Sequence, residues 1–368
     1  MRFIRNAKSY AQQDRLIIFI GAQPPPLHGM SYINRAICDR LLADGKRVKL
    51  LNTAGFGISR RYFIRGARAL RVIPLMLYHA VLVATRSSVS YMALSGGRGQ
   101  LYDLVFVISS RVFGSHLMLH HHSYAYLNQR RLLTSLIFRL AGNEACHVCL
   151  SDSMSGVLKE RYGVNKIISL SNSFFIDIEP VSAGKLLPDG KVIKLGFLSN
   201  ITESKGIHEF LQLIRVLDES GFAIEGEIAG PFESVELKEA VLREVSRSSR
   251  LSYIGPVYAG DKMEFFKRID CLIFPTKYEN EAEPVTLIES LSQGVPVIAY
   301  GRGAIPELLD ESCGFVVAAE SGFVDAAAYI LRARGLEGLR IWSENSIKRF
   351  DALASRARNN WCEVLQEI

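Results

Sequence analysis

Short runs of apolar residues alternate along this chain with longer segments in which apolar residues recur every three or four positions. The short runs predict buried parallel strands, and the longer segments predict helices that cover them. The first such unit is a strand over 16–21, a helix over 32–42 and a strand over 47–51, which together form a βαβ unit. The same alternation continues through expected strands over 90–94, 116–120, 145–150 and 167–170.

The alternation is interrupted over 174–189, a segment with proline and glycine, and it then starts again. The sequence therefore predicts an α/β fold with two doubly wound, Rossmann-like domains facing each other across a cleft. We expect a first domain over 1–175 and a second over 176–345. A last helix over 346–368 should pack back on the first domain, with Trp361 as a packing residue.

Charge is distributed unevenly between the two halves. The 368 residues carry a net charge of +7, but residues 1–150 hold 20 Lys and Arg against 5 Asp and Glu. Arg61, Arg65 and Arg68 fall on one side of an expected amphipathic helix, a pattern typical of docking on an anionic membrane surface. The basic half lacks the interleaved aromatic residues of single-strand binders and any recognition motif, so we expect no nucleic acid partner.

The six cysteines lie in apolar segments, which favours buried, reduced thiols in a cytoplasmic protein. Cys146 and Cys149 have the CxxC spacing, but the sequence has no second pair and indicates no zinc or redox site there. No apolar stretch reaches the length of a membrane span. We therefore expect a cytoplasmic protein that is soluble or peripheral at the membrane face.

Glu281 and Glu289 bracket the start of an expected helix that follows a buried strand. Pro284 fits near the first helical turn, because an N–H group at that position would have no hydrogen-bond partner within the helix. The amides of Val285, Thr286 and Leu287 are then expected to point out of the helix end. Such an end attracts phosphate, and the two carboxylates can accept hydrogen bonds from sugar hydroxyls. The pattern indicates a site for a sugar nucleotide.

This region resembles the family 4 retaining glycosyltransferases, also called glycosyl transferases group 1, which have the two-domain B-type architecture. The resemblance rests on the Glu281-x7-Glu289 pair, on Gly294-Val-Pro-Val and on the turn Gly303-Ala-Ile-Pro-Glu307. It implies a retaining transfer of a hexose-type residue from a nucleotide diphosphate sugar to a glycan or lipid-linked acceptor, as in bacterial surface polysaccharide assembly. In the family, Glu281 would orient the donor sugar and Glu289 the ribose.

Lys205 matches the family lysine that neutralises the leaving diphosphate, within the stretch Ser199 to Gly206. Asn200 stands where the family has arginine, so one fixed charge on the donor phosphates is missing. With Lys205, the amides after Pro284 would stabilise the charge that develops on the diphosphate.

Two segments of the first half carry further candidates. The loop after the first strand has three prolines, His28 and Gly29, and it resembles a loop of some family members in which glycine lets the backbone approach the donor or acceptor. His120 ends the expected strand over 116–120, and His121 and His122 follow it. Residues two apart in an extended chain share a side, so His120 and His122 should face the same way. Family members commonly place such a histidine near the donor sugar, with His120 the first candidate.

No metal or other cofactor is expected. The sequence has no Asp-x-Asp pair to bridge a metal to a diphosphate, and consecutive histidines point to opposite sides of a strand. Two other functions remain open from the sequence. These are a nucleotide-sugar epimerase of the same architecture and a basic nucleic-acid-binding protein.

Overall fold

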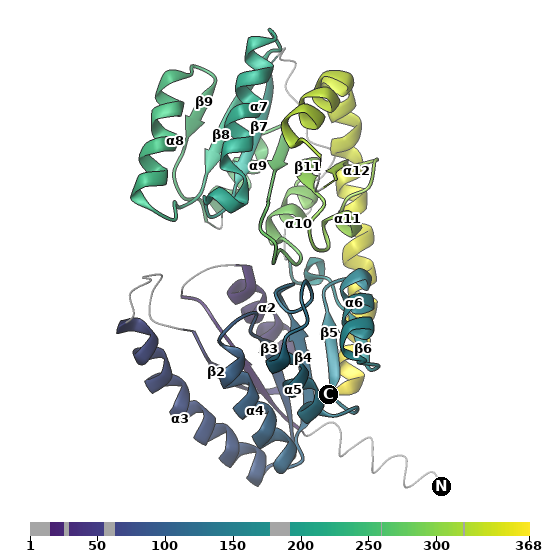
Figure 1. The fold of residues 1–368 in the computed structure, drawn as a ribbon. Helices are drawn as coiled ribbons and strands as arrows, with labels where there is room; N and C mark the ends of the chain where they lie inside the picture. The colour runs from purple at the N-terminus through teal and green to yellow at the C-terminus, as the bar shows by residue number, and fades with distance from the viewer. Residues whose placement is uncertain (1–14, 26–28, 55–62, 177–191, 259, 319–320) are drawn as a thin grey trace. The chain divides into compact units, whose positions relative to one another are not determined.

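The structure is a computed structural model that describes residues 15–25, 29–54, 63–176, 192–258, 260–318 and 321–368, except for the side chains of 63–70 (Figure 1). The chain divides into two compact units. Unit 1 comprises Met1–Phe175 with Ala357–Ile368, and unit 2 comprises Ile176–Arg356.

Unit 1 is built on a parallel sheet with the strand order β2-β1-β3-β4-β5-β6. Its strands are β1 (Leu16–Gly21), β2 (Arg47–Asn52), β3 (Ser88–Leu94), β4 (His116–His121), β5 (Cys146–Cys149) and β6 (Ile167–Ser169). The connecting helices are α2 (Gly29–Ala43), α3 (Phe63–Thr85), α4 (Gln100–Val112), α5 (Leu132–Ala141) and α6 (Asp152–Tyr162), followed by the short helix η1 (Asn172–Phe175). Every residue of β3 is buried, as a parallel strand covered by helices on both faces requires.

Unit 2 has a second parallel sheet, in the order β12-β11-β10-β7-β8-β9. Its strands are β7 (Ile193–Leu198), β8 (Ile224–Ala229), β9 (Leu251–Tyr253), β10 (Cys271–Phe274), β11 (Val297–Tyr300) and β12 (Gly314–Val317). Its helices are η2 (Glu203–Lys205), α7 (Ile207–Glu219), α8 (Val235–Arg247), α9 (Gly260–Arg268), α10 (Val285–Ser292), α11 (Ile305–Leu308) and α12 (Phe323–Glu367). The prediction of two doubly wound α/β domains is confirmed.

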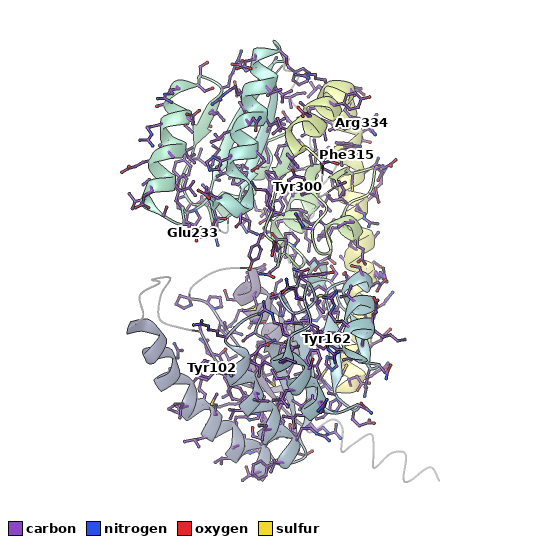
Figure 2. The ribbon with its side chains drawn as sticks, in the orientation of Figure 1. Tyr102, Tyr162, Glu233, Tyr300, Phe315 and Arg334 are labelled. Atoms are coloured by element: carbon purple, nitrogen blue, oxygen red, sulfur yellow. The ribbon has the colours of Figure 1, made fainter. Side chains whose placement is uncertain are left out.

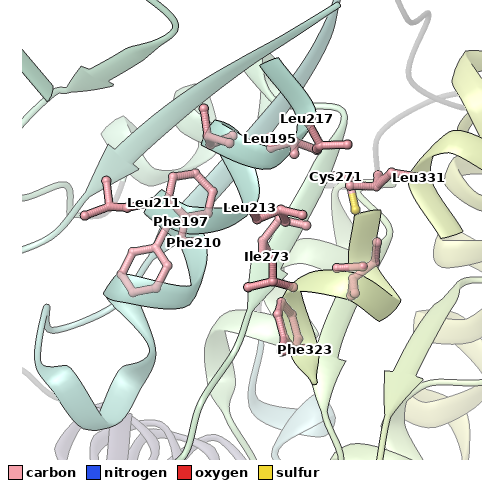
Figure 3. Packing of buried hydrophobic residues seen from close by; sticks show 14 of the residues in the cluster. Leu195, Phe197, Phe210, Leu211, Leu213, Leu217, Cys271, Ile273, Phe323 and Leu331 are labelled. Carbon is pink, nitrogen blue, oxygen red and sulfur yellow. The ribbon is translucent and has the colours of Figure 1, made fainter. Parts of the chain in front are cut away.

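The core of unit 2 forms where α7 and the start of α12 pack against the sheet (Figure 3). Leu195 and Ile273 come from adjacent strands, Phe210 and Leu213 from α7, and Phe323 from α12; each is at most 2% exposed. Tyr300, labelled in Figure 2, ties the end of β11 to α12, because its hydroxyl donates to the Ser321 carbonyl at 3.1 Å and accepts from the Phe323 amide at 3.2 Å. These contacts fix the strand ends that carry the candidate site.

The last helix, α12, is longer than the sequence indicates. It begins at Phe323, and Gly335 interrupts it with φ 56° and ψ −166°, so two helical segments meet there. Residues from Ala357 onward belong to unit 1. Trp361 packs against the rings of Phe174 and Phe175, and its indole N–H donates to Asp44 Oδ2 at 2.7 Å.

Two expectations need correction, on the start of α2 and on the burial of the cysteines. Helix α2 begins at Gly29, three residues before the expected start, because glycine and serine are acceptable in a first turn. Helix α3 contains most of the basic segment that the sequence indicated as helical, and it runs through Pro74 to Thr85. Five of the six free cysteines are buried as expected, but Cys362 is exposed on α12. Among the described helices, none is long and apolar enough to cross a membrane.

Candidate functional site

The candidate site of unit 2 lies where β7 and β10 pair at the middle of the sheet. The chain leaves β7 toward β8 on one side and leaves β10 toward β11 on the other, so the loops after these two strands diverge. Ligands of doubly wound sheets bind at such a switch point, at the carboxyl ends of the strands. Lys205 follows β7, and Glu281 follows β10.

Glycine at position 206 lets the loop after β7 pack directly on the end of β10. Gly206 has φ +83°, and a Cβ there would lie 2.1 Å from the Pro275 carbonyl oxygen, so no larger residue fits. The Lys277 amide donates to the Ser204 carbonyl at 2.7 Å, and Thr202 caps the turn by accepting from the Lys205 amide at 3.1 Å. These contacts place Lys205 beside the loop that carries Glu281.

Lys205 and Glu281 form an ion pair between Lys205 Nζ and Glu281 Oε2. The same carboxylate oxygen accepts a hydrogen bond from the Thr276 hydroxyl at 3.0 Å. The ammonium also lies over the rings of Tyr278 and Phe274, at 5.1 and 5.6 Å from their centroids. The structure thus brings together two residues that the sequence assigned to one site. The Lys205 ammonium is positioned where it could also contact an anionic ligand.

A glycine-rich turn holds the Glu281 loop from the other side. Gly303 has φ +54°, and a Cβ there would lie 2.1 Å from the carbonyl oxygen of Glu281. The Ala304 amide donates to the Ala282 carbonyl at 2.8 Å. The turn after β11 therefore sets the position of the Glu281 backbone.

The start of α10 offers fewer free amides than expected. Pro284 is the buried residue before the helix, and Val285 and Thr286 are half-buried in its first turn. The Leu287 amide donates to the Pro284 carbonyl at 3.1 Å, so the expectation that it points out freely is wrong. A tight 3₁₀-type bond at the helix start has taken this donor. Val285 and Thr286 remain the candidate anion donors.

Glu289 lies one turn further along α10, and its exposed fraction is 6%. It forms an ion pair with Lys262 of α9. Lys262 Nζ donates to both carboxylate oxygens at 2.8 Å. Burial raises the pKa of Glu289 above its ordinary value, and the Lys262 charge opposes that rise. Lys262 therefore helps to keep Glu289 ionised, as an acceptor of hydroxyl groups must be.

Replacing Lys262 by methionine should make nucleotide binding sensitive to pH. Without the ammonium, the pKa of Glu289 rises further, so the carboxyl group takes up a proton at a higher pH and loses acceptor capacity as pH falls. We expect binding to weaken at a higher pH in Lys262→Met than in the wild type, where Lys262 opposes the rise in the pKa of Glu289 that burial causes. Calorimetric titration with the tightest-binding nucleoside diphosphate between pH 5 and 8 measures this.

Lys267→Met is the matched control, because Lys267 lies on the same helix and pairs with the exposed Glu264 at 2.7 Å. Its binding profile should follow the wild type. Parallel profiles for Lys262→Met and the wild type would remove Lys262 from the site.

In unit 1, His120 is fully buried at the end of β4. Its Nδ1 lies 2.9 Å from the Tyr91 hydroxyl, and its ring lies 4.1 Å from the ring of His122. Among the described residues, neither His120 Nε2 nor His122 Nε2 has a hydrogen-bond partner. Burial lowers the pKa of both, to about 4 for His122, so both are neutral near pH 7. Two neutral rings with unpaired nitrogens can hydrogen bond a hydroxyl group of a ligand.

His121 faces away from His120 and His122 and is held by protein groups. Its Nδ1 lies 2.8 Å from the Tyr126 hydroxyl, and its Nε2 lies 3.0 Å from His147 Nδ1. The alternation along the strand that the sequence predicted is present, and it makes His121 a structural residue.

The remaining candidates are less constrained. Asn200 is exposed in the loop after β7, and Gly29 is the exposed first residue of α2. His28 and Arg61 lie outside the described residues, as do the side chains of Arg65 and Arg68 in α3. Within the described ranges, no group of three or more His, Cys, Asp or Glu side chains could hold a metal ion.

Sequence reasoning missed Thr276 and Lys262. Thr276 follows the proline that ends β10, and Lys262 lies in the first turn of α9, 27 positions before Glu289. Neither carries a local signal, because each reaches its carboxylate only after separate elements have packed.

Two doubly wound parallel sheets are the architecture of the B fold of glycosyltransferases. Residues 180–349 match the family described as glycosyl transferases group 1.

The relatives share limited identity with this chain. It is 28% identical over 135 residues to the capsular polysaccharide biosynthesis glycosyltransferase CapM of Staphylococcus aureus, covering 36% of this chain and 34% of CapM. It is 28% identical over 152 residues to the lipopolysaccharide core biosynthesis mannosyltransferase LpsB of Rhizobium meliloti, covering 38% of this chain and 42% of LpsB. The matches thus span well under half of either relative.

Among solved structures, Alr3699/HepE of Anabaena in complex with UDP superposes with a TM-score of 0.68, at 12% identity over 96% of this chain and 100% of that chain. At this identity the likeness shows the fold alone.

Proposed function

We propose that this protein is a retaining glycosyltransferase that moves a hexose-type residue from a nucleotide diphosphate sugar to a glycan or lipid-linked acceptor. The observation that carries the proposal is the pairing of Lys205 with Glu281 at the switch point, on the loop that leads into α10 and Glu289. The relatives named above act in capsular polysaccharide and lipopolysaccharide biosynthesis, which supports a role in bacterial surface polysaccharide assembly.

Within this proposal, the diphosphate binds at the start of α10, where the amides of Val285 and Thr286 and the Lys205 ammonium offer positive charge. The ion pair with Glu281 opens as phosphate takes the place of the carboxylate. Glu281 then accepts hydrogen bonds from the sugar, and Glu289 accepts them from the two ribose hydroxyls. Charge grows on the leaving phosphate as the glycosidic bond breaks, so donors that are already in place stabilise the transition state.

The proposal also covers the residues whose roles rest on the family resemblance. His120, with His122 beside it, donates a hydrogen bond from Nε2 to the sugar. In this arrangement the Tyr91 hydroxyl donates to His120 Nδ1, so the proton of the neutral ring is on Nε2. Gly29 begins the helix after the first strand of one sheet, and Asn200 lies in the loop after the first strand of the other; substrate phosphates bind at such strand ends in this fold.

We further propose a location at the cytoplasmic face of the membrane, with anionic lipid as the partner of the basic half and no nucleic acid partner. All six cysteines are free, which supports a reducing compartment. The acceptor is then a lipid-linked glycan.

Incubating the purified protein with a panel of UDP, GDP and ADP sugars tests the reaction, with mass spectrometry of the products. We expect one donor to release its nucleoside diphosphate, faster with a glycan acceptor, and the anomeric configuration of the product to match the donor by NMR. Turnover should survive EDTA, because no bound metal is required. Loss of turnover with rescue by magnesium would contradict the metal-free mechanism, and an epimerised nucleotide sugar formed without acceptor would indicate an epimerase.

A further inference from the structure

Helix α4 of unit 1 presents an apolar stripe to its outside. Leu101, Val105, Ile108 and Val112 are all exposed, from 42% for Val105 to 70% for Val112. Their spacing of three or four residues places them on one side of the helix. A stripe of this kind normally faces a core, so here it marks a surface for a partner.

The neighbouring helices repeat the pattern. Leu132, Leu136 and Leu140 form an exposed stripe on α5, with Leu132 at 90%. Leu77 and Val81 are 68% and 58% exposed on the described part of α3. Three helices thus each expose residues that α/β proteins usually bury.

The three helices form one layer. The chain runs β2, β3, β4, β5 in one direction across the sheet, so right-handed crossovers place α3, α4 and α5 on the same face. His79 Nδ1 of α3 lies 2.8 Å from Ser109 Oγ of α4, and the Thr134 hydroxyl of α5 donates to Gln100 of α4 at 2.9 Å. The stripes therefore belong to a single surface, which we call the outer helical face (Figure 1).

Hydrogen-bonded polar side chains are buried beneath this layer. His79 Nε2 lies 3.0 Å from Ser90 Oγ of β3, and the Ser110 hydroxyl of α4 donates to the same Ser90 oxygen at 2.9 Å. Helix α4 also buries Phe106 and Val107 on its inner side, so it carries apolar residues on both its inner and its outer side.

Charge on the outer helical face has one sign. Between Asp44 and Glu144 the sequence has a single acidic residue, Asp103, which is 6% exposed and accepts from the Ser95 amide at 2.8 Å. Among residues 71–143, the exposed basic residues are Arg86, Arg98, Arg111, Arg130, Arg131 and Arg139.

We propose that the outer helical face docks this protein on an anionic lipid bilayer, with the apolar stripes of α4 and α5 entering the headgroup region. Arginines around an apolar stripe fit a surface that offers both acyl chains and negative charge. A second copy of the same face would bring like charges together, because a twofold interface is self-complementary. The choice of a bilayer rests on the lipid-linked acceptor proposed above, but the face is made of other residues than Arg61, Arg65 and Arg68.

Co-sedimentation with vesicles of phosphatidylcholine, with or without about a third phosphatidylglycerol, tests the proposal on the full chain. We expect the wild type to bind the anionic vesicles, less at high salt, and the double variant Val105→Glu, Val112→Glu to lose about tenfold or more in partitioning. The double variant Val235→Glu, Ile341→Glu adds the same charges at exposed apolar positions of unit 2 and should bind like the wild type.

The double variant Val105→Glu, Val112→Glu is called the α4 variant below. An unchanged unfolding temperature and unchanged nucleotide binding would show that it still folds. Wild-type protein that ignores anionic vesicles at low salt overturns the proposal, and so does an α4 variant that binds as well as the wild type. A wild-type dimer that the α4 variant converts to a monomer would assign the face to a second copy instead. The assay needs no donor or acceptor, so its failure is distinct from failure of the sugar-transfer proposal.

Discussion

Replacing Lys205 by methionine should lower the turnover number about a hundredfold to a thousandfold, while donor affinity falls much less. The loss corresponds to about 3 to 4 kcal/mol, the usual effect of removing one preorganised group that stabilises developing charge. The ground-state diphosphate can still use the start of α10, but the transition state carries more charge on the leaving phosphate. Turnover and donor dissociation constants, measured separately, check this split.

Two further variants interpret that result. Lys277→Met removes a nearby lysine that pairs with Glu209 at 2.6 Å on the surface, and it should leave turnover intact. Lys205→Met alone leaves the Glu281 carboxylate without its cation. Lys205→Met combined with Glu281→Gln removes both charges of the ion pair, so comparing the two variants separates the effect of losing the cation from the effect of an unpaired carboxylate. A normal turnover number in Lys205→Met would exclude Lys205 from the mechanism.

Replacing Glu289 by alanine should weaken binding of the nucleotide about tenfold to a hundredfold. A hydrogen bond to a charged group contributes about 1.5 to 3 kcal/mol, and this carboxylate is the expected acceptor for the ribose. Calorimetry with the nucleoside diphosphate measures the change. Glu264→Ala, an exposed glutamate on α9, is the control and should bind normally. Equal affinities for Glu289→Ala and the wild type would place the ribose elsewhere.

The succession of strands and helices along the chain could be predicted from the sequence, because parallel strands that are covered on both faces leave continuous apolar runs. Strand β10, for example, was predicted from the apolar run that ends at Pro275, and all four of its residues are buried in the structure. The opposite orientations of His120 and His121 followed from the period of two along a strand. The position of Glu281 followed from a strand, a proline and a helix in close succession.

Contacts between distant elements could not be predicted in the same way. The ion pair between Lys262 and Glu289 depends on how α9 packs beside α10, and no local sequence pattern specifies how two helices pack. Gly303 stands in a recognisable turn, but only the structure shows that it must be glycine because its Cβ would meet the Glu281 carbonyl. The exposed stripe of α4 could not be recognised from the sequence, because the spacing of apolar residues does not say which side of a helix faces the sheet.

A crystal structure of the protein with its nucleotide donor tests the central claim most directly. The account predicts the diphosphate at the start of α10, contacted by the amides of Val285 and Thr286 and by Lys205 in place of Glu281, with the ribose hydroxyls on Glu289. A nucleotide bound at another edge of the sheet, or bound with Lys205 still paired to Glu281 and away from phosphate, would contradict it.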